Sequence, residues 1–277
     1  MTESLIISAE FLYARKVAIS NFYRVLLARE PTKDELEYYA ASEEPLERVF
    51  ICVKAANYGS IKDKEKLPVT AVVLAKNAEG SIVMCLDSVC GFVSEIVLLE
   101  DASTTDNTAK IAADYGARLY KAGFSDFGNM KTIVAHLAIQ PWVLLVDTDE
   151  VINQTEVGLI EEMIQDDSVD IWGLPRRRWA DLEMTNQVEK EAYPDWQYRL
   201  FRSSTDIRYE HRVHERIVGS DKIKKAVEGP HIEHFQDVFK TGDKLKERNS
   251  LYRRLYELDV NDGVERTCPA VAGIDDI

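Results

Sequence analysis

Two carboxylates one residue apart follow an apolar run, and of all the residues in the sequence they are the best suited to chemistry. The run at 142–146 reads WVLLV and predicts a buried strand, and Asp147 and Asp149 come directly after it. Two carboxylates beside a buried sheet are costly to leave unpaired, so we expect them to share a cation. Oxygen ligands at this spacing suit Mn²⁺ or Mg²⁺. The alternative is a solvated helix start, with Asp149 or Glu150 near the N-terminus.

A second acidic segment follows the apolar run at 95–99. Asp101 in this segment can accept hydrogen bonds from a nucleobase or a ribose, as acidic residues do after strands of nucleotide-binding sheets. The alternative is a turn and a helix cap, for which Ser, Thr, Asp and Asn are the usual residues. We expect residues 103–106 to have that structural role, which leaves Asp101 as the candidate for binding.

The elements that position these residues alternate along the chain from Val69 onward. Strands are predicted at 69–75, 95–99, 117–120 and 142–146, and helices at 81–90, 106–115 and 127–139. Continuous apolar strands joined by helices predict an α/β fold with a mostly parallel sheet and helices on both faces. Ligands of such sheets bind beyond the carboxyl ends of the strands, which is where the acidic segments lie.

The flanking regions differ from this central pattern. The apolar spacing in residues 1–66 predicts a small all-helical part that ends in a polar linker at 61–66. A capping box at Thr32 and Glu35 would open the second helix, and a third would begin at Ser42. It carries no obvious chemical group, so we interpret it as a module for a protein partner. Beyond Pro175 the chain is more basic, and we expect strands at 197–202 and 216–218 and one long helix at 237–258.

The charge of the chain is distributed unevenly. The formal net charge of −14 argues against nucleic acid or anionic lipid as the main partner. Residues 67–174 carry 5 basic and 17 acidic side chains, whereas residues 175–260 carry 18 and 16. The sequence has no transmembrane segment, no signal pattern and no C-x-x-C pair, so we expect a cytoplasmic protein with reduced cysteines. An anionic ligand that binds to residues 67–174 therefore requires a divalent ion, together with basic side chains from residues 175–260.

Several motifs in order resemble the family 2 glycosyltransferases. The segments are VTAVVLAKNA, EIVLLEDASTTDNTAKIAADYGA and WVLLVDTDE, where the family usually has D-D-G-S-T-D-x-T and then D-A-D. Further on, YPDWQYRLFR and RVHE resemble the subgroup that includes lipopolysaccharide-core glucosyltransferases. The resemblance implies a nucleotide-diphospho-sugar transferase fold of the glycosyltransferase A type, a metal bound through D-x-D, and transfer with inversion. Glu100, Ala102 and Thr148 depart mildly from the family pattern.

The same resemblance implies roles for the acidic residues. Asp101 would hold the base of the nucleotide, with Ala75 and Lys76 lining the same pocket. Asp149 would be the direct metal ligand, and Asp147 would lie nearer the ribose or the sugar.

A late histidine would complete the metal shell. His234, before Phe235, best matches the family's His-aromatic pair, with His231 as the fallback and a buried structural histidine as the alternative for each. Neither the pair at 211 and 214 nor the pair at 231 and 234 can chelate one ion from a regular strand, because residues three apart face opposite sides.

An inverting transfer also needs a general base and cations for the departing diphosphate. Asp195 falls where the family tends to place the base, and Glu215 is the competitor. The structural alternatives are a turn residue for Asp195 and an arginine partner for Glu215. Arg199 and Lys244 are the cations that we assign to the diphosphate or the acceptor.

The sequence therefore predicts a metal-dependent, inverting glycosyltransferase. The donor would be a nucleotide-diphospho-sugar, by resemblance a UDP-sugar, and the acceptor a hydroxyl of a glycan or glycoconjugate. One rival is a nucleotidyltransferase on a sugar phosphate, but no glycine-rich phosphate loop follows the first strand. The other rival is a non-catalytic sugar-nucleotide-binding or scaffold protein.

The sequence predicts three parts, namely a helical module with its linker (1–66), a catalytic domain (67–260) and an acidic tail (261–277). The catalytic domain divides into a nucleotide and metal half (67–174) and an acceptor half (175–260). The stretch at 21–31 resembles a short helical domain of bacterial surface and secreted proteins.

Overall fold

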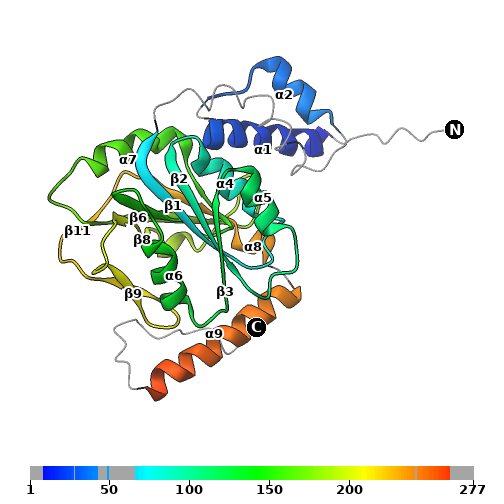
Figure 1. Ribbon diagram of the computed structural model, residues 1–277. Helices are drawn as coiled ribbons and strands as arrows, with labels where there is room; N and C mark the ends of the chain where they lie inside the picture. Colours follow the sequence, from blue (N-terminus) through cyan, green and yellow to red (C-terminus); the bar gives the residue numbers. More distant parts are fainter. Residues whose placement is uncertain (1–8, 28, 43–48, 50–65, 241, 263–277) are drawn as a thin grey trace.

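The computed structural model describes residues 9–27, 29–42, 49, 66–240 and 242–262 (Figure 1). Its main sheet contains β1 (Leu67–Ala75), β2 (Val93–Asp101), β3 (Arg118–Ala122), β4 (Trp142–Leu145), β5 (Glu150–Ile152), β6 (Ile171–Trp179), β7 (Gln187–Val188), β8 (Asp195–Arg202), β11 (Ile223–Lys225) and β12 (Ile232–His234). A separate ribbon pairs β9 (Arg208–Glu210) with β10 (Arg216–Val218). The helices are α1 (Ala9–Leu27), α2 (Lys33–Ala40), α4 (Ile82–Cys90), α5 (Thr108–Asp114), α6 (Phe127–His136), α7 (Val157–Ile164), α8 (Gln236–Phe239) and α9 (Gly242–Asn261), with 3₁₀ turns η1 (Gln154–Glu156) and η2 (Lys190–Ala192).

The main sheet is mixed, with the order β3-β2-β1-β4-β8-β6-β12-β5. The first four strands are parallel, as the sequence predicts. Strand β8 is antiparallel to both of its neighbours, β4 and β6, and β5 is antiparallel to β12. Strand β8 follows β6 without a crossover helix and pairs with it antiparallel, whereas β11 and β12 pair with β6 in parallel. The prediction of a mostly parallel sheet therefore fits β1–β4, and the later strands form a mixed extension.

Helices cover both faces of the sheet. Helices α4, α5 and α7 lie on one face and α6 on the other (Figure 1). Alternate residues of β1 follow this division, because Ala71 and Val73 pack with Ile82 of α4, whereas Val72 packs with Val134 of α6. Strand β1 is thus buried on both faces, and this explains its continuous apolar sequence.

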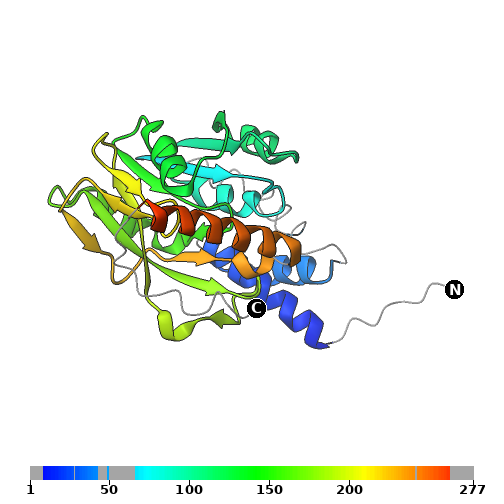
Figure 2. The same ribbon diagram turned by 90° about the horizontal axis from the view of Figure 1, so that it is seen from below.

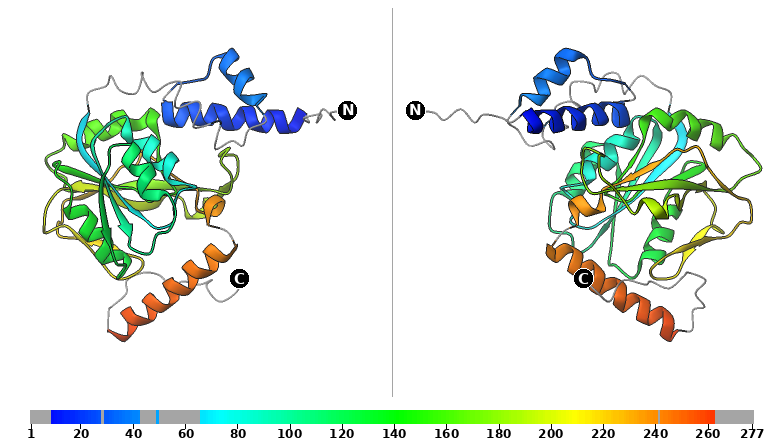
Figure 3. Two further views of the ribbon diagram at one scale, coloured as in Figure 1. Left: turned by 45° about the vertical axis from the view of Figure 1, so that its right-hand side comes forward. Right: turned by 180° about the vertical axis from the view of Figure 1, so that it is seen from behind.

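Helix α1 packs against the α/β part of the chain, and α2 packs against α1. Helix α2 begins at Thr32 with the predicted capping box, in which both Thr32 and Glu35 make their hydrogen bonds. Helix α1 contributes Ile19 and Tyr23 to a buried cluster that also contains Phe235. Figure 3 shows both helices on the side of the sheet that carries α4. The separate module at 1–66 stays a prediction, and the third helix predicted from Ser42 falls outside the described residues except at Ser42 and Val49.

The predicted long helix at 237–258 is wrong in one respect, because the structure contains two helices there. Helix α8 ends at Phe239 with Lys240 as its C-terminal cap, and α9 begins at Gly242, whose φ of +57° is a left-handed value that glycine adopts without strain. Helix α9 then crosses the molecule in front of the sheet when seen from below (Figure 2). Among the described helices, none combines the length and apolar character that crossing a membrane requires.

Replacing Gly219 with alanine tests the tight packing between the β9–β10 ribbon and its neighbouring loop. Gly219 has a φ of +107°, and a Cβ there would lie 2.0 Å from the carbonyl oxygen of Asp206. We expect Gly219→Ala to lower the free energy of unfolding by about 2–4 kcal/mol, measured by urea denaturation. The control is Gly80→Ala, because a Cβ at Gly80 meets no atom within 4 Å. It should change stability by less than about 1 kcal/mol, and equal effects of the two variants would contradict the argument.

Candidate active site

The predicted acidic segments meet at one edge of the sheet. Ala75 at the end of β1 pairs with Glu100 of β2, and Val72 of β1 pairs with Leu145 at the end of β4. Asp101 and the segment that begins at Asp147 therefore leave neighbouring strands at the same edge. This is the geometry in which open α/β sheets bind their ligands.

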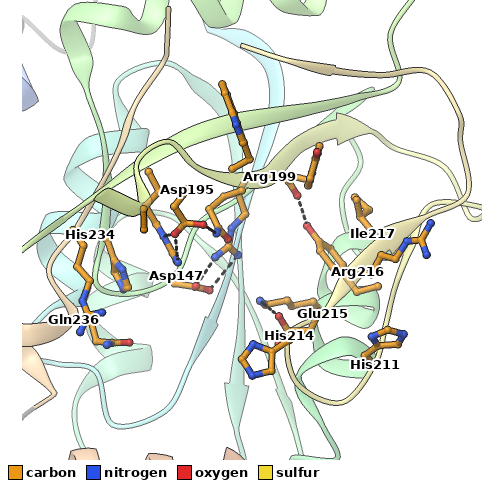
Figure 4. Close-up of a pocket in the computed structure, with 18 of the residues that line it drawn as sticks. Asp147, Asp195, Arg199, His211, His214, Glu215, Arg216, Ile217, His234 and Gln236 are labelled. Carbon is orange, nitrogen blue, oxygen red and sulfur yellow. Dashed lines mark hydrogen bonds and ion pairs between the residues drawn. The ribbon is translucent and has the colours of Figure 1, made fainter. Parts of the chain in front are cut away.

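A cavity of about 1240 Å³ lies beside this edge (Figure 4). Its wall comes mainly from β6, β8, β10, the loop before β10, and the two C-terminal helices. Five of the predicted site residues line it, namely Asp147, Asp195, Arg199, Glu215 and His234. The other five lie outside its lining, namely Ala75, Lys76, Asp101, Asp149 and Lys244.

Asp149 is buried, and its carboxylate faces two nitrogen atoms. His234 Nε2 lies 3.6 Å from Asp149 Oδ2, and Lys240 Nζ lies 2.7 Å from the same oxygen. Neither carboxylate oxygen receives a hydrogen bond of good geometry, and Nδ1 of His234 is buried without a partner among the described residues. Burial would raise the pKa of Asp149, but the neighbouring His234 and Lys240 hold it well below its ordinary value.

These two residues fit a divalent cation as a partial set of ligands. A carboxylate and an imidazole are both metal ligands, and both carry buried atoms that lack a hydrogen bond. In the part of the chain that the structure describes, no third His, Cys, Asp or Glu gathers with them. Such a pair suits Mn²⁺ or Mg²⁺, since these ions take remaining ligands from water and substrate phosphates.

His231, the fallback ligand, is engaged elsewhere. Its Nδ1 lies 2.9 Å from a carboxylate oxygen of Glu156, and its Nε2 lies 2.9 Å from the hydroxyl of Tyr193. Both ring nitrogens therefore have protein partners. The structure places His234, and not His231, against Asp149.

Asp147 belongs to a network of buried charges. Its carboxylate accepts a hydrogen bond of 2.6 Å from Nη2 of Arg199, which also lies 3.2 Å from Oε1 of Glu150. Glu150 is 0 % exposed and makes a second ion pair, with Arg176 at 3.2 Å. Burial would raise the pKa of Asp147, but positive charges, above all that of Arg199, hold it far below its ordinary value. Because the Arg199 guanidinium is occupied by these carboxylates, the arrangement favours a positioning role over direct contact with a diphosphate.

The two candidate bases face the cavity from different elements. Asp195 begins β8, and its Oδ2 accepts hydrogen bonds from Arg176, while Oδ1 accepts one of 2.8 Å from Gln197. Glu215 pairs with Lys131 at 2.9 Å. The Asp195 side chain is 44 % exposed and that of Glu215 only 12 %, so Asp195 is the more accessible to an acceptor in the cavity.

The residues proposed for the nucleotide lie together at the ends of β1 and β2. Asp101 Oδ1 accepts two hydrogen bonds of 2.7 Å from Ser103, and Lys76 Nζ lies 3.6 Å from Asp101 Oδ2. Burial would raise the pKa of Asp101, but the Ser103 hydrogen bonds and Lys76 lower it overall. Asp101 thus caps its own turn with one oxygen and keeps the other beside a cation. Lys244 is exposed on α9 and lies outside the cavity lining, so its assignment stays a prediction.

The structure adds cavity residues that the sequence did not single out. Lys131 comes from α6, and Arg248 and Tyr252 come from α9. Arg248 stacks over the Tyr252 ring at 5.2 Å and donates a hydrogen bond to Gln236, with no carboxylate partner among the described residues. The spacing of four residues between Arg248 and Tyr252 on a predicted helix was the available signal, since such residues share one face.

The family profile named Glycosyl transferase family 2 matches residues 70–221 of this sequence, which is more than half of the chain. The chain belongs to this family. Its fold is of the glycosyltransferase A type. Two curated relatives are uncharacterized glycosyltransferases from Rickettsia felis and Rickettsia typhi, each 27% identical over 86 residues. The match covers 31% of this chain and 30% and 29% of theirs, so the chain spans less than a third of those relatives.

Solved structures of this glycosyltransferase fold are distant in sequence. Residues 1–349 of Staphylococcus aureus TarS, in complex with UDP-GlcNAc, align with a TM-score of 0.52 at 14% identity. That alignment covers 73% of this chain and 68% of TarS 1–349. Glucosyl-3-phosphoglycerate synthase from Mycobacterium tuberculosis aligns with a TM-score of 0.48 at 15% identity, covering 75% of this chain and 84% of that one. The TarS alignment shows a shared fold.

Replacing Arg199 with methionine tests the buried charge network. Without the guanidinium, Glu150 and Asp147 lose their shared partner, and we expect the free energy of unfolding at pH 7 to fall by about 3–5 kcal/mol. In the wild type, the low pKa of Asp147 stabilises the fold above the ordinary carboxyl value of about 3.9, and this stabilisation is lost as the pH falls. This loss occurs below about pH 4, so the difference between wild type and Arg199→Met should be smaller at pH 3 than at pH 7, as urea denaturation would measure.

The matched control for this variant is Arg208→Met. Arg208 forms an ion pair with Glu210, but both side chains are well exposed. Its removal should change stability by less than about 1 kcal/mol at either pH. A difference between wild type and Arg199→Met that stays constant with pH would contradict the proposed network.

Proposed function

We propose that the protein is a metal-dependent, inverting glycosyltransferase that moves a sugar from a UDP-sugar to a hydroxyl of a glycan or glycoconjugate. The observation that carries this proposal is the buried carboxylate of Asp149, which receives no hydrogen bond of good geometry and faces His234 and Lys240 at the ligand-binding edge of the sheet. The motifs YPDWQYRLFR and RVHE extend the proposal to the subgroup of lipopolysaccharide-core glucosyltransferases.

The nucleotide is proposed to lie across the ends of β1 and β2. There Asp101 accepts hydrogen bonds from the base, and Ala75 and Lys76 line the same pocket. Asp147 is placed nearer to the ribose or the sugar, held by Arg199. The UDP-GlcNAc complex of TarS, a protein of the same fold, supports a UDP-sugar as the donor.

The diphosphate is proposed to lie between the sheet edge and α9. Asp149 and His234 would hold the Mn²⁺ or Mg²⁺ ion, which when bound offsets the negative charge of the departing diphosphate. Arg248 adds a fixed guanidinium, because it is held by Gln236 and Tyr252 and lacks a carboxylate partner among the described residues. An arginine suits a diphosphate because it can donate two parallel hydrogen bonds.

Asp195 is proposed as the general base. It would take the proton from the acceptor hydroxyl while that oxygen bonds to the anomeric carbon and the bond to the diphosphate breaks. Arg176 and Gln197 fix the orientation of the Asp195 carboxylate. Because attack opposite the leaving group inverts the anomeric centre, one carboxylate is sufficient for this chemistry.

The acceptor is proposed to occupy the part of the cavity beyond Asp195. Aromatic side chains suited to stacking on sugar rings line it, namely Tyr193, Trp196, Tyr198 and Tyr209.

We also infer a protein partner for the N-terminal helices, since Tyr13 and Tyr38 are largely exposed there. A cytoplasmic location fits Cys85, which is buried and free.

Asp149→Asn tests the metal assignment through donor binding. A panel of UDP-sugars with Mn²⁺ should raise the Tm of the wild type, by about 5–10 °C when the ligand is at 100 times its Kd. In Asp149→Asn, Mn²⁺ should no longer increase this shift. The control is Asp114→Asn, an exposed carboxylate at the end of α5, which should keep the Mn²⁺ effect. A Mn²⁺ effect of wild-type size in Asp149→Asn would refute the assignment.

Asp195→Asn and Glu215→Gln separate the two candidate bases. We expect Asp195→Asn to lower kcat by about 10²- to 10⁴-fold, since it removes the proton acceptor, while the donor-induced Tm shift is kept. Glu215→Gln should have a smaller effect, because that carboxylate is engaged by Lys131. Steady-state release of UDP in the presence of acceptor measures both. If Glu215→Gln lost more in kcat than Asp195→Asn, the roles would be reversed.

A further inference from the structure

The ammonium group of Lys240 forms the shortest contact that the described residues make with the Asp149 carboxylate. Its Nζ lies 2.7 Å from Oδ2, closer than Nε2 of His234 at 3.6 Å. The His234 distance is too long for a hydrogen bond. Two positive or metal-binding groups therefore converge on one buried carboxylate oxygen, and only the lysine is in direct ionic contact.

We propose that Lys240 is an internal counter-ion that occupies Asp149 until a divalent cation displaces it. This inference rests on the proposed function, because it assigns the divalent cation to Asp149 and His234. A buried carboxylate without a cation is costly, so a resident ammonium stabilises the fold before metal binds. A divalent ion on the same oxygen would repel the ammonium, and so the two cannot share it.

The position of Lys240 in the chain allows this displacement. Lys240 is the C-terminal cap of the four-residue helix α8, and Gly242, with its left-handed φ, begins α9. The Lys240 side chain is 36 % exposed and lines the cavity, so the ammonium can leave Asp149 toward the cavity without crossing the core. The path leads to the space assigned to the diphosphate, near Gln236 and Arg248.

Displacement would couple the binding of metal and donor. Without nucleotide, a divalent ion must break the contact between Lys240 and Asp149 in order to bind, and this lowers the affinity of the protein for the ion. When the diphosphate is present, the released ammonium gains an anionic partner, and the affinity for metal rises. Coupling of this kind is reciprocal, so metal must raise the affinity for the donor by the same factor.

The test is the affinity for Mn²⁺ in the absence of nucleotide, measured by calorimetry on the full chain. We expect Lys240→Met to bind Mn²⁺ at least about tenfold more tightly than the wild type, equivalent to about 1.4 kcal/mol. Lys240→Arg keeps the charge and should stay close to wild type. Lys246→Met is the matched control, since Lys246 is 81 % exposed on α9 and pairs with Asp243. Circular dichroism confirms that each variant is folded.

A second measurement uses UDP as the diphosphate probe. In the wild type, UDP should increase the affinity for Mn²⁺, and in Lys240→Met this increase should be several-fold smaller. Mn²⁺ binding to Lys240→Met that is equal to or weaker than wild type, including no detectable binding to either, overturns the inference. Asp149→Asn separates this result from failure of the proposed function. If Asp149→Asn abolishes Mn²⁺ binding while Lys240→Met leaves it unchanged, the metal site stands and only the counter-ion role fails.

Discussion

The site depends on the burial of carboxylates at the end of β4. Asp149 and Glu150 are buried and each needs a positive partner because the sheet edge excludes water from them, and the half-buried Asp147 beside them shares one of these partners. The partners come from later in the chain, with Arg199 on β8 and Lys240 after α8. The acidic part of the sequence therefore cannot form this edge without the more basic part, and the two fold around one set of ion pairs.

This constraint explains why the mixed part of the sheet matters for function. Strand β8 runs antiparallel between β4 and β6, so its first residues lie near the point where β4 ends. That direction brings Arg199 to Asp147 and places Asp195 at the mouth of the cavity. A strand parallel to β4 in the same place would have its C-terminal end at the site instead of its N-terminal end. The departure from a parallel sheet is what joins the candidate base to the edge that carries Asp147 and Asp149.

The sequence predicted the features that are encoded locally. The alternation of apolar runs and helical segments predicted β1–β4 and α4–α6, and the resemblance to the family's His-aromatic pair favoured His234 over His231, which the structure places beside Asp149. Strands β5, β6 and β12 and the pairing of Lys240 with Asp149 were not predicted, because they depend on strand order and on contacts between residues far apart in the chain. The break between α8 and α9 had a local signal in Gly242, which the apolar periodicity on both sides obscured.

The net charge of −14 acquires a structural meaning from these contacts. A sheet edge rich in carboxylates repels an anionic donor, and the arginines nearest to it, Arg176 and Arg199, are already paired with Glu150 and its neighbours. Binding of a diphosphate therefore requires positive charge that is not already neutralised. Arg248 has no carboxylate partner among the described residues, and Lys240 has one that a divalent cation can take over. Such an exchange would keep the buried carboxylate neutralised at every stage while adding positive charge where the diphosphate is expected to bind.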